Sequence, residues 1–198
     1  MKYEMKPLPF DPQKINGLSE RMLISHYENN YGGAVRRLGA ISDQLASLDY
    51  EKAPVFVING LKREELIATN SMILHECYFA GLGEPAAPGS RLAEAVNRDF
   101  GSLDKWRSQF AAMARAQAGG SGWVMLTYSE RDSHLRNTWA QDHATTLAGG
   151  APLLVLDMYE HSYHIDYGAK AADYVAASMN VLNWSNADRM YNRLSHST

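Results

Sequence analysis

The sequence has a single cysteine, Cys77, so it can form no intrachain disulfide, and a disulfide-stapled scaffold is excluded. It has no run of 18 apolar residues, which a transmembrane helix would need. Its first residues carry charges where a signal peptide needs an apolar stretch. These absences predict a cytoplasmic protein with no membrane partner.

Basic residues are not in excess either, because the chain has 19 Lys and Arg but 22 Asp and Glu, which gives a formal net charge of −3. A broadly basic surface is therefore excluded, and we expect no nucleic-acid partner. Apolar residues make up 45% of the 198 residues and charged residues 21%, which is the balance of a globular protein with a substantial core.

Helical patterns dominate the first third of the chain. Ser19 is a candidate N-cap for a helix that we expect to weaken or kink at Gly32 and Gly33. Further helices are expected over 35–48 and 62–79, and long helices with short connections predict an antiparallel hairpin. A Gly- and Pro-rich stretch at 81–90 then predicts the boundary between an N-terminal helical domain, residues 1–83, and a C-terminal domain, residues 90–198.

The second half mixes helical and strand patterns. Helices are expected over 91–99, 103–116 and 169–194, and strands over 122–128, 134–139 and 152–159. The first two strands could pair as a hairpin, and the nearly continuous apolar run of the third is typical of a buried central strand. Helices, then strands, then helices predict an α+β fold.

Four potential metal ligands come from separate stretches. Asp157 ends the apolar strand and His161 follows it four residues later. An unpaired buried carboxylate is costly, so Asp157 either caps the next helix or holds a cation. His26 and His75 lie in apolar settings on the two hairpin helices, and each alone could equally be a core residue. Together, three imidazoles and one carboxylate would suit iron, manganese or zinc.

Several short motifs agree in order and spacing with one known family. They lie at residues 6–10, 25–27, 97–102, 120–123, 152–154, 157–163 and 183–184. The most specific is Asp-Met-Tyr-Glu-His-Ser-Tyr at 157–163. On these motifs the chain resembles the iron/manganese superoxide dismutases over nearly its whole length.

The resemblance implies an N-terminal antiparallel helical hairpin packed on a C-terminal α+β domain with a three-stranded antiparallel sheet. It implies one mononuclear manganese or iron ion between the two parts, bound by His26, His75, Asp157 and His161. The implied reaction converts superoxide to dioxygen and hydrogen peroxide, which needs two adjacent oxidation states and so excludes zinc as the working ion. The implied assembly is a homodimer or homotetramer.

The resemblance also implies roles around the metal. Gln141 corresponds to the amide that hydrogen-bonds the solvent on the metal in manganese-type members, while Ser71 stands where iron-type members usually have a glutamine. This pattern favours manganese, with iron the alternative. Trp123 is expected to form a wall of the site, and Glu160 and Tyr163 to connect the two sites of a dimer.

The chain departs from the family pattern at the substrate channel. Asn30 and Ala34 stand where family members place a histidine and a tyrosine that gate the channel and help deliver protons, and Tyr159 replaces a tryptophan. An alanine cannot donate a proton. The second proton therefore needs another route, such as a water held by Asn30, or Tyr31 or Tyr27 if the glycine kink turns one of them inward.

The altered gate leaves two alternatives to dismutation. A metal-binding paralogue could handle peroxide or hydrolyse a larger substrate with a metal-bound hydroxide, since a channel beside Ala34 would be wide. A non-catalytic homologue is the other alternative. Retention of all four ligands argues against it, because a buried Asp157 without a metal would be a liability.

Overall fold

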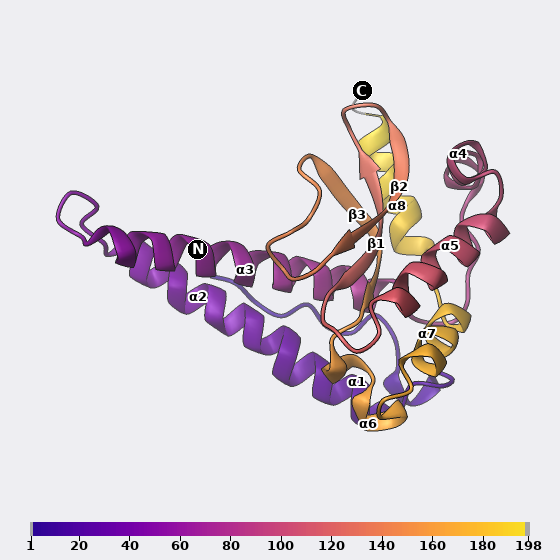
Figure 1. Cartoon of the computed structure of the whole chain (residues 1–198), viewed down its shortest axis with the longest axis horizontal. Coiled ribbons are helices and arrows are strands. Elements are labelled where there is room, and N and C mark those ends of the chain that lie inside the picture. The colour runs from indigo at the N-terminus through magenta and orange to yellow at the C-terminus, as the bar shows by residue number, and fades with distance from the viewer. Residues whose placement is uncertain (1, 197–198) are drawn as a thin grey trace.

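A long helical hairpin and an α+β unit make up the molecule, which is described here by a computed structural model covering residues 2–196. Figure 1 shows the hairpin of α2 and α3 extending to one side, while the sheet and the remaining helices gather at its base. The predicted α+β class, with a three-stranded antiparallel sheet, is confirmed.

The first arm of the hairpin is one nearly continuous helix. After a short turn, η1 (Pro12–Lys14), α1 (Glu20–Ser25) begins at the predicted N-cap, where the Ser19 hydroxyl accepts a hydrogen bond from the N–H of Met22 at 3.1 Å. The chain then passes through a π-helical segment, His26–Tyr31, into α2 (Gly32–Ala46). The weakening or kink expected at Gly32 and Gly33 does not lie at the glycines themselves, because both are inside the continuing helix and the irregularity is the wider π turn directly before them.

The second arm, α3 (Val55–Ala80), begins seven residues before the predicted start at 62. Its first turn is rich in β-branched residues, which have low helix propensity and so hide the start of the helix from a sequence pattern. Along the outer part of the hairpin, the arms pack through a small apolar cluster of Leu38, Ile41, Leu45 and Ala68.

The C-terminal unit begins with α4 (Ser90–Phe100) and α5 (Leu103–Ala116), close to their predicted ranges. The strands are β1 (Trp123–Ser129), β2 (His134–Ala140) and β3 (Gly150–Asp157), in the order β2-β1-β3. The central strand is thus β1, and the prediction that the 152–159 run is central was wrong. β3 is nevertheless buried towards its end because α3 and α8 pack against it.

After β3 come η3 (Glu160–Ser162), α6 (His164–Tyr167), α7 (Ala171–Asn180) and α8 (Ser185–Ser195). The helix predicted over 169–194 is therefore two helices, and the interruption between them pairs with the linker after α3 through the bridges Leu82–Leu182 and Ala86–Asn183. No helix in the 2–196 range combines the length and apolarity needed to span a bilayer.

One apolar core joins the hairpin to the C-terminal unit. It contains Leu23 and Leu74 from the hairpin together with Val124, Leu154 and Tyr174 from the sheet and α7. Because the base of the hairpin is packed into this shared core, side chains from α1, α3 and the end of β3 meet where the two parts join.

Candidate metal centre

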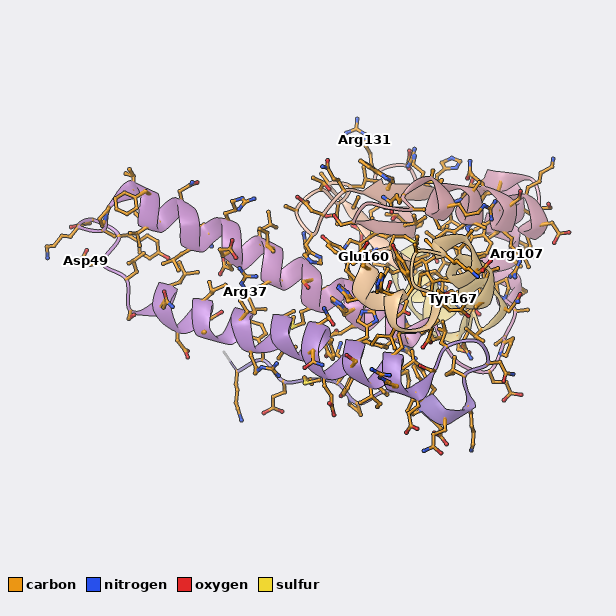
Figure 2. The ribbon with its side chains drawn as sticks, turned by 60° about the horizontal axis from the view of Figure 1, so that its bottom comes forward. Arg37, Asp49, Arg107, Arg131, Glu160 and Tyr167 are labelled. Carbon is orange, nitrogen blue, oxygen red and sulfur yellow. The ribbon has the colours of Figure 1, made fainter. Side chains whose placement is uncertain are left out.

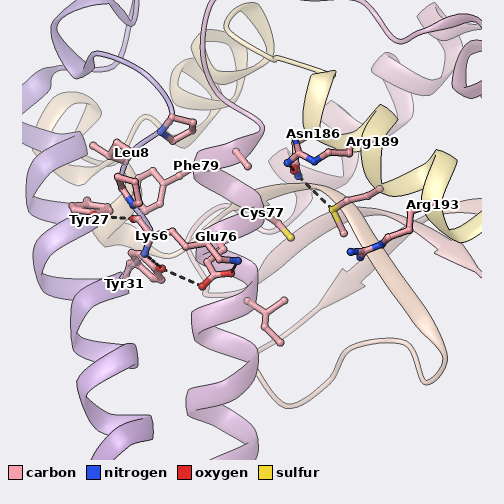
Figure 3. A pocket seen from close by; sticks show the side chains of 15 residues that line it. Lys6, Leu8, Tyr27, Tyr31, Glu76, Cys77, Phe79, Asn186, Arg189 and Arg193 are labelled. Carbon is pink, nitrogen blue, oxygen red and sulfur yellow. Dashed lines mark hydrogen bonds and ion pairs between the residues drawn. The ribbon is translucent and has the colours of Figure 1, made fainter. Parts of the chain in front are cut away.

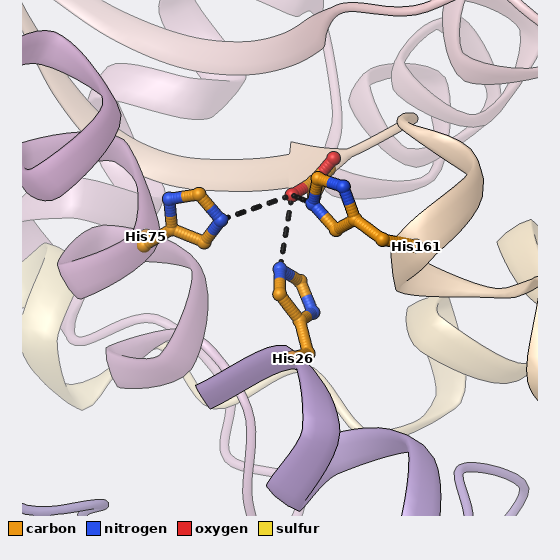
Figure 4. Close-up of side chains that lie close together, drawn as sticks. His26, His75 and His161 are labelled. Carbon is orange, nitrogen blue, oxygen red and sulfur yellow. Dashed lines mark hydrogen bonds and ion pairs between the residues drawn. The ribbon is translucent and has the colours of Figure 1, made fainter. Parts of the chain in front are cut away.

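Four side chains meet at this junction from four separate elements. His26 opens the π-helical segment, His75 lies on α3, Asp157 ends β3 and His161 lies in η3. One ligand atom from each lies within 4.8 Å of all the others (Figure 4). The first three side chains are almost completely buried, so this is an interior polar cluster rather than a surface group of acids and bases.

Asp157 is the centre of the cluster. Its Oδ2 lies 3.1 Å from Nε2 of His26, 3.1 Å from Nε2 of His161 and 3.6 Å from Nε2 of His75. Its Oδ1 accepts a hydrogen bond from the backbone N–H of Tyr159 at 2.8 Å, which leaves Oδ2 directed at the three imidazoles. The carboxylate is therefore oriented by the chain immediately after β3.

The orientation of His75 determines which of its nitrogens faces the centre. Nδ1 donates to the backbone carbonyl of Ser71, one turn earlier on α3, at 2.7 Å. The proton is then on Nδ1, and the unprotonated Nε2 is buried with no hydrogen-bond partner among the described residues. A buried imidazole acceptor held in this way is what a metal ion needs, since ligating histidines usually donate their other ring N–H to a carbonyl or carboxylate.

The protonation states also suit a cation. Burial lowers the pKa of His75 to about 3, and burial likewise lowers the pKa of His26. Burial alone would raise the pKa of Asp157, but the neighbouring His161 and His26 outweigh it and hold that pKa below its usual range. Neutral His26 and His75 beside an ionised Asp157 are deprotonated ligands of the kind that metal binding requires, and the donor set of three imidazoles and one carboxylate fits iron or manganese.

Aromatic rings enclose the centre on one side. β1 pairs Trp123 directly opposite Asp157, and the indole packs edge-on against His75 with ring centroids 5.1 Å apart. Tyr159 stacks on His161 at 5.4 Å and on His143 at 5.0 Å. These large rings exclude bulk water and fix the imidazoles.

His143, rather than the expected amide of Gln141, lies beside the centre. Its Nδ1 accepts a hydrogen bond from the Trp123 indole N–H at 3.0 Å, and burial lowers its pKa. The ring is therefore neutral, with its proton on Nε2. Gln141, in contrast, is exposed, and its backbone groups bond to Ser121 and Thr145. Gln141 is therefore not brought to the centre. The sequence does place a histidine, His143, 14 residues before Asp157, and this residue could have been considered for the same role.

A channel of about 340 Å³ reaches the centre from the hairpin side. Its lining includes His75, His143 and His161, and also Asn30 and Ala34, the two positions at which the family gate was expected. No tyrosine belongs to this lining among the described residues. The channel therefore has an amide and a methyl group where a gate would have an imidazole and a phenol.

The two tyrosines considered as substitutes lie elsewhere. The Tyr31 hydroxyl accepts from the backbone N–H of Lys6 at 2.8 Å and donates to Glu76 at 3.1 Å, while the Tyr27 hydroxyl donates to the Lys6 carbonyl at 2.8 Å. Both rings line a separate cavity of about 440 Å³, shown in Figure 3. Burial raises the pKa of Tyr31 to about 12, so this phenol keeps its proton and is not brought into the channel.

The two residues expected at a dimer contact have different environments. Tyr163 is buried and packs on Tyr174 with ring centroids 5.2 Å apart, so within this chain it is a core residue. Glu160 is exposed beside His161, whose side chain is 27% exposed. Of the pair, Glu160 is the residue available to another molecule.

Comparison with known proteins gives one family match and three similar proteins. A family model described as the C-terminal domain of iron/manganese superoxide dismutases matches residues 88–190. A superoxide dismutase (Fe) of Cupriavidus metallidurans is 63% identical, over 94% of this chain and 95% of its own length. The superoxide dismutase (Mn) 2 of Haloferax volcanii is 31% identical over 96% of each chain. The superoxide dismutase (Fe) of Methanothermobacter thermautotrophicus is 30% identical over 96% of this chain and 94% of its own.

Proposed function

The chain belongs to the iron/manganese superoxide dismutases, and we propose that it dismutates superoxide at one iron or manganese ion held by His26, His75, Asp157 and His161. The observation that carries this assignment is the buried, unprotonated Nε2 of His75, which faces an ionised carboxylate and has no hydrogen-bond partner among the described residues. A cation at the centre of the four ligand atoms would satisfy that nitrogen and offset the charge of Asp157.

When bound there, the ion would supply one-electron chemistry between two adjacent oxidation states, so that one superoxide is oxidised to dioxygen and a second, with two protons, is reduced to hydrogen peroxide. The chain's own residues have three tasks: they hold the ion, admit a small anion and provide protons. Trp123 and Tyr159 keep the ligand imidazoles in place and exclude other water.

Protons and hydrogen bonds in the channel come from His143 and Asn30 in this proposal. The neutral His143 ring has its N–H at Nε2, because Nδ1 already accepts from Trp123, and it can donate that hydrogen bond to an anion in the channel. The Asn30 carboxamide, in the same lining, can hold a water. Tyr31 takes no part, because its hydroxyl is bonded to Lys6 and Glu76.

Iron is the ion that we propose. The preference for manganese depended on Gln141 at the centre, and this side chain is exposed instead. The relative that is 63% identical bears the name superoxide dismutase (Fe). Elemental analysis of protein purified from its native cells decides the point, and a predominance of manganese would contradict the proposal.

We also propose a homodimer formed through the surface around Glu160. His161 is partly exposed there, and Glu160 and His164 beside it are exposed, with Ile165 43% exposed. A second copy that covered this surface would shield the centre from water, and Glu160 of one copy could bond to His161 of the other. Sedimentation analysis of the native chain and of Glu160→Ala tests this, and a native monomer at micromolar concentration would contradict it.

The test of the activity uses purified protein of known metal content. With iron bound, we expect superoxide to decay far faster than it disproportionates alone, in proportion to the iron present. His75→Ala is expected to hold little iron and to leave the decay at the uncatalysed rate. Full iron occupancy in the native protein without catalysis would reject the proposed function.

A further inference from the structure

We propose that Arg37 attracts superoxide into the channel and that Glu64 limits this attraction. The proposal rests on the proposed function, because it concerns the entry of that substrate. It starts from the overall charge, since a protein with a formal charge of −3 repels an anion unless positive charge is placed where the anion enters.

Arg37 lies on α2 and lines the same 340 Å³ channel as Asn30 and Ala34, and Figure 2 labels it between α2 and α3. Of the described residues in that lining, Arg37 alone has a side chain with a permanent charge. A guanidinium stays protonated at every working pH, so its attraction for an anion does not depend on titration.

The charge of Arg37 is shared with its neighbours. Its guanidinium is ion-paired to Glu64 on α3, and Arg63 lies with Nη1 3.8 Å from Oε1 of the same carboxylate. Two guanidinium groups thus share one carboxylate, and the cluster of Arg37, Glu64 and Arg63 has a net charge of +1. Since the Arg37 side chain is 58% exposed, its field reaches an anion through water and is screened by salt.

The geometry predicts opposite effects for the two partners. Removing the charge of Arg37 leaves Glu64 paired only with Arg63, so the cluster becomes neutral and no longer attracts an anion. Removing the charge of Glu64 leaves both guanidinium groups free to attract the anion. For charges about 10 Å apart in water, each change alters association with a monoanion by about twofold at low salt.

Arg36 provides a matched control, because it is the preceding residue on the same helix, is also exposed, and lies outside the channel lining. Its Nη2 is instead 3.5 Å from the Glu28 carbonyl. Arg36→Gln therefore removes the same formal charge from the same helix without removing it from the channel.

The experiment compares Arg37→Gln, Arg36→Gln, Glu64→Gln and native protein, all loaded with iron and matched for iron content. We measure kcat/KM for superoxide from about 10 mM to about 500 mM ionic strength, and the dissociation constant of azide from the change in visible absorption. At low salt we expect kcat/KM to fall about twofold for Arg37→Gln, to rise for Glu64→Gln and to stay unchanged for Arg36→Gln. The differences should vanish at high salt, and the dissociation constant of azide should rise about twofold in Arg37→Gln at low salt.

Equal effects of Arg37→Gln and Arg36→Gln would overturn the proposal, because only overall charge would then matter. A loss that persists at high salt would overturn it too, since that pattern indicates a structural role. Azide binding does not need turnover. If the native protein failed to remove superoxide, the proposed function would fall, while the azide measurements would still decide what Arg37 does to an anion.

Discussion

The residues on the two sides of His75 have different contacts, and this difference explains why Tyr27 and Tyr31 do not line the channel. On one side, Tyr27 and Tyr31 are bonded to the N-terminal arm and line a separate cavity. On the other, Asn30 and Ala34 face the open channel. Each pair is spaced four residues apart, so each follows one face of the helix, and one residue turns the helix by about 100°. A tyrosine near a ligand in sequence is therefore no evidence for a tyrosine in the channel.

The largest effect is expected from the loss of one of the four proposed metal ligands. His161→Ala removes one of four ligands and leaves Asp157 with less compensation, so iron affinity should fall about 1,000-fold and the melting temperature should drop with it. Metal content after dialysis and calorimetry measure the two quantities. A variant that retains iron like the native protein would show that His161 is not a ligand.

The metal-free protein should lose stability in acid. The pKa of His75 is lowered to about 3 by burial, whereas in the unfolded chain it is near 6.5, so the unfolded state binds more protons between these values. Stability is then fully present above about pH 6.5 and is lost as the pH falls towards 3, with about 3 kcal/mol lost from this group by pH 4. Urea titration of the metal-free chain at pH 7 and pH 4 measures the loss, and His75→Gln should reduce it. Equal stability at the two pH values would contradict a buried neutral His75.

On the channel side, His143→Ala should lower kcat about tenfold while leaving the iron content unchanged, because it removes the donor at Nε2 and no ligand. His143→Gln should recover part of the loss, since its amide can still accept from Trp123 and donate into the channel. Stopped-flow kinetics with metal analysis tests both variants. An unchanged kcat in His143→Ala would remove this residue from the mechanism.

On the tyrosine side, the effect should be on stability alone. Tyr31→Phe deletes the hydroxyl that joins Lys6 to Glu76, which should cost about 1 kcal/mol of unfolding free energy and change kcat by less than twofold. Chemical denaturation and steady-state assays check this. A tenfold fall in kcat would show that the two sides of His75 are not functionally separate.

Sequence reasoning succeeded where local chemistry determines structure. The Ser19 cap and the ranges of α4, α5 and the strands follow from residue patterns that act over a few positions. The start of α3 was hidden by β-branched residues, and the π-helical turn has no periodic signature that precedes tertiary packing. The division of the chain into 1–83 and 90–198 stays a prediction.

At the site, the four potential ligands could be proposed from sequence because their types and surroundings imply burial and metal chemistry. The exposed side chain of Gln141 could not be foreseen, because the residue lies between β2 and β3, where no periodicity determines which side chain turns inward. His143, two residues later, is the one that meets Trp123. Tyr163 shows the same limit, since an aromatic residue in a family motif has the same pattern whether it packs inside the chain or against another copy.

The π-helical segment, His26–Tyr31, has a further consequence for how such a site changes over generations. A π turn holds one residue more than an α turn, so the loss of a single codon from it would let the ligand helix close into regular α geometry. The residues after the segment would keep their packing, because closing the wider turn offsets the missing residue. The segment is therefore a place where a residue beside a ligand can be lost while the rest of the hairpin keeps its contacts.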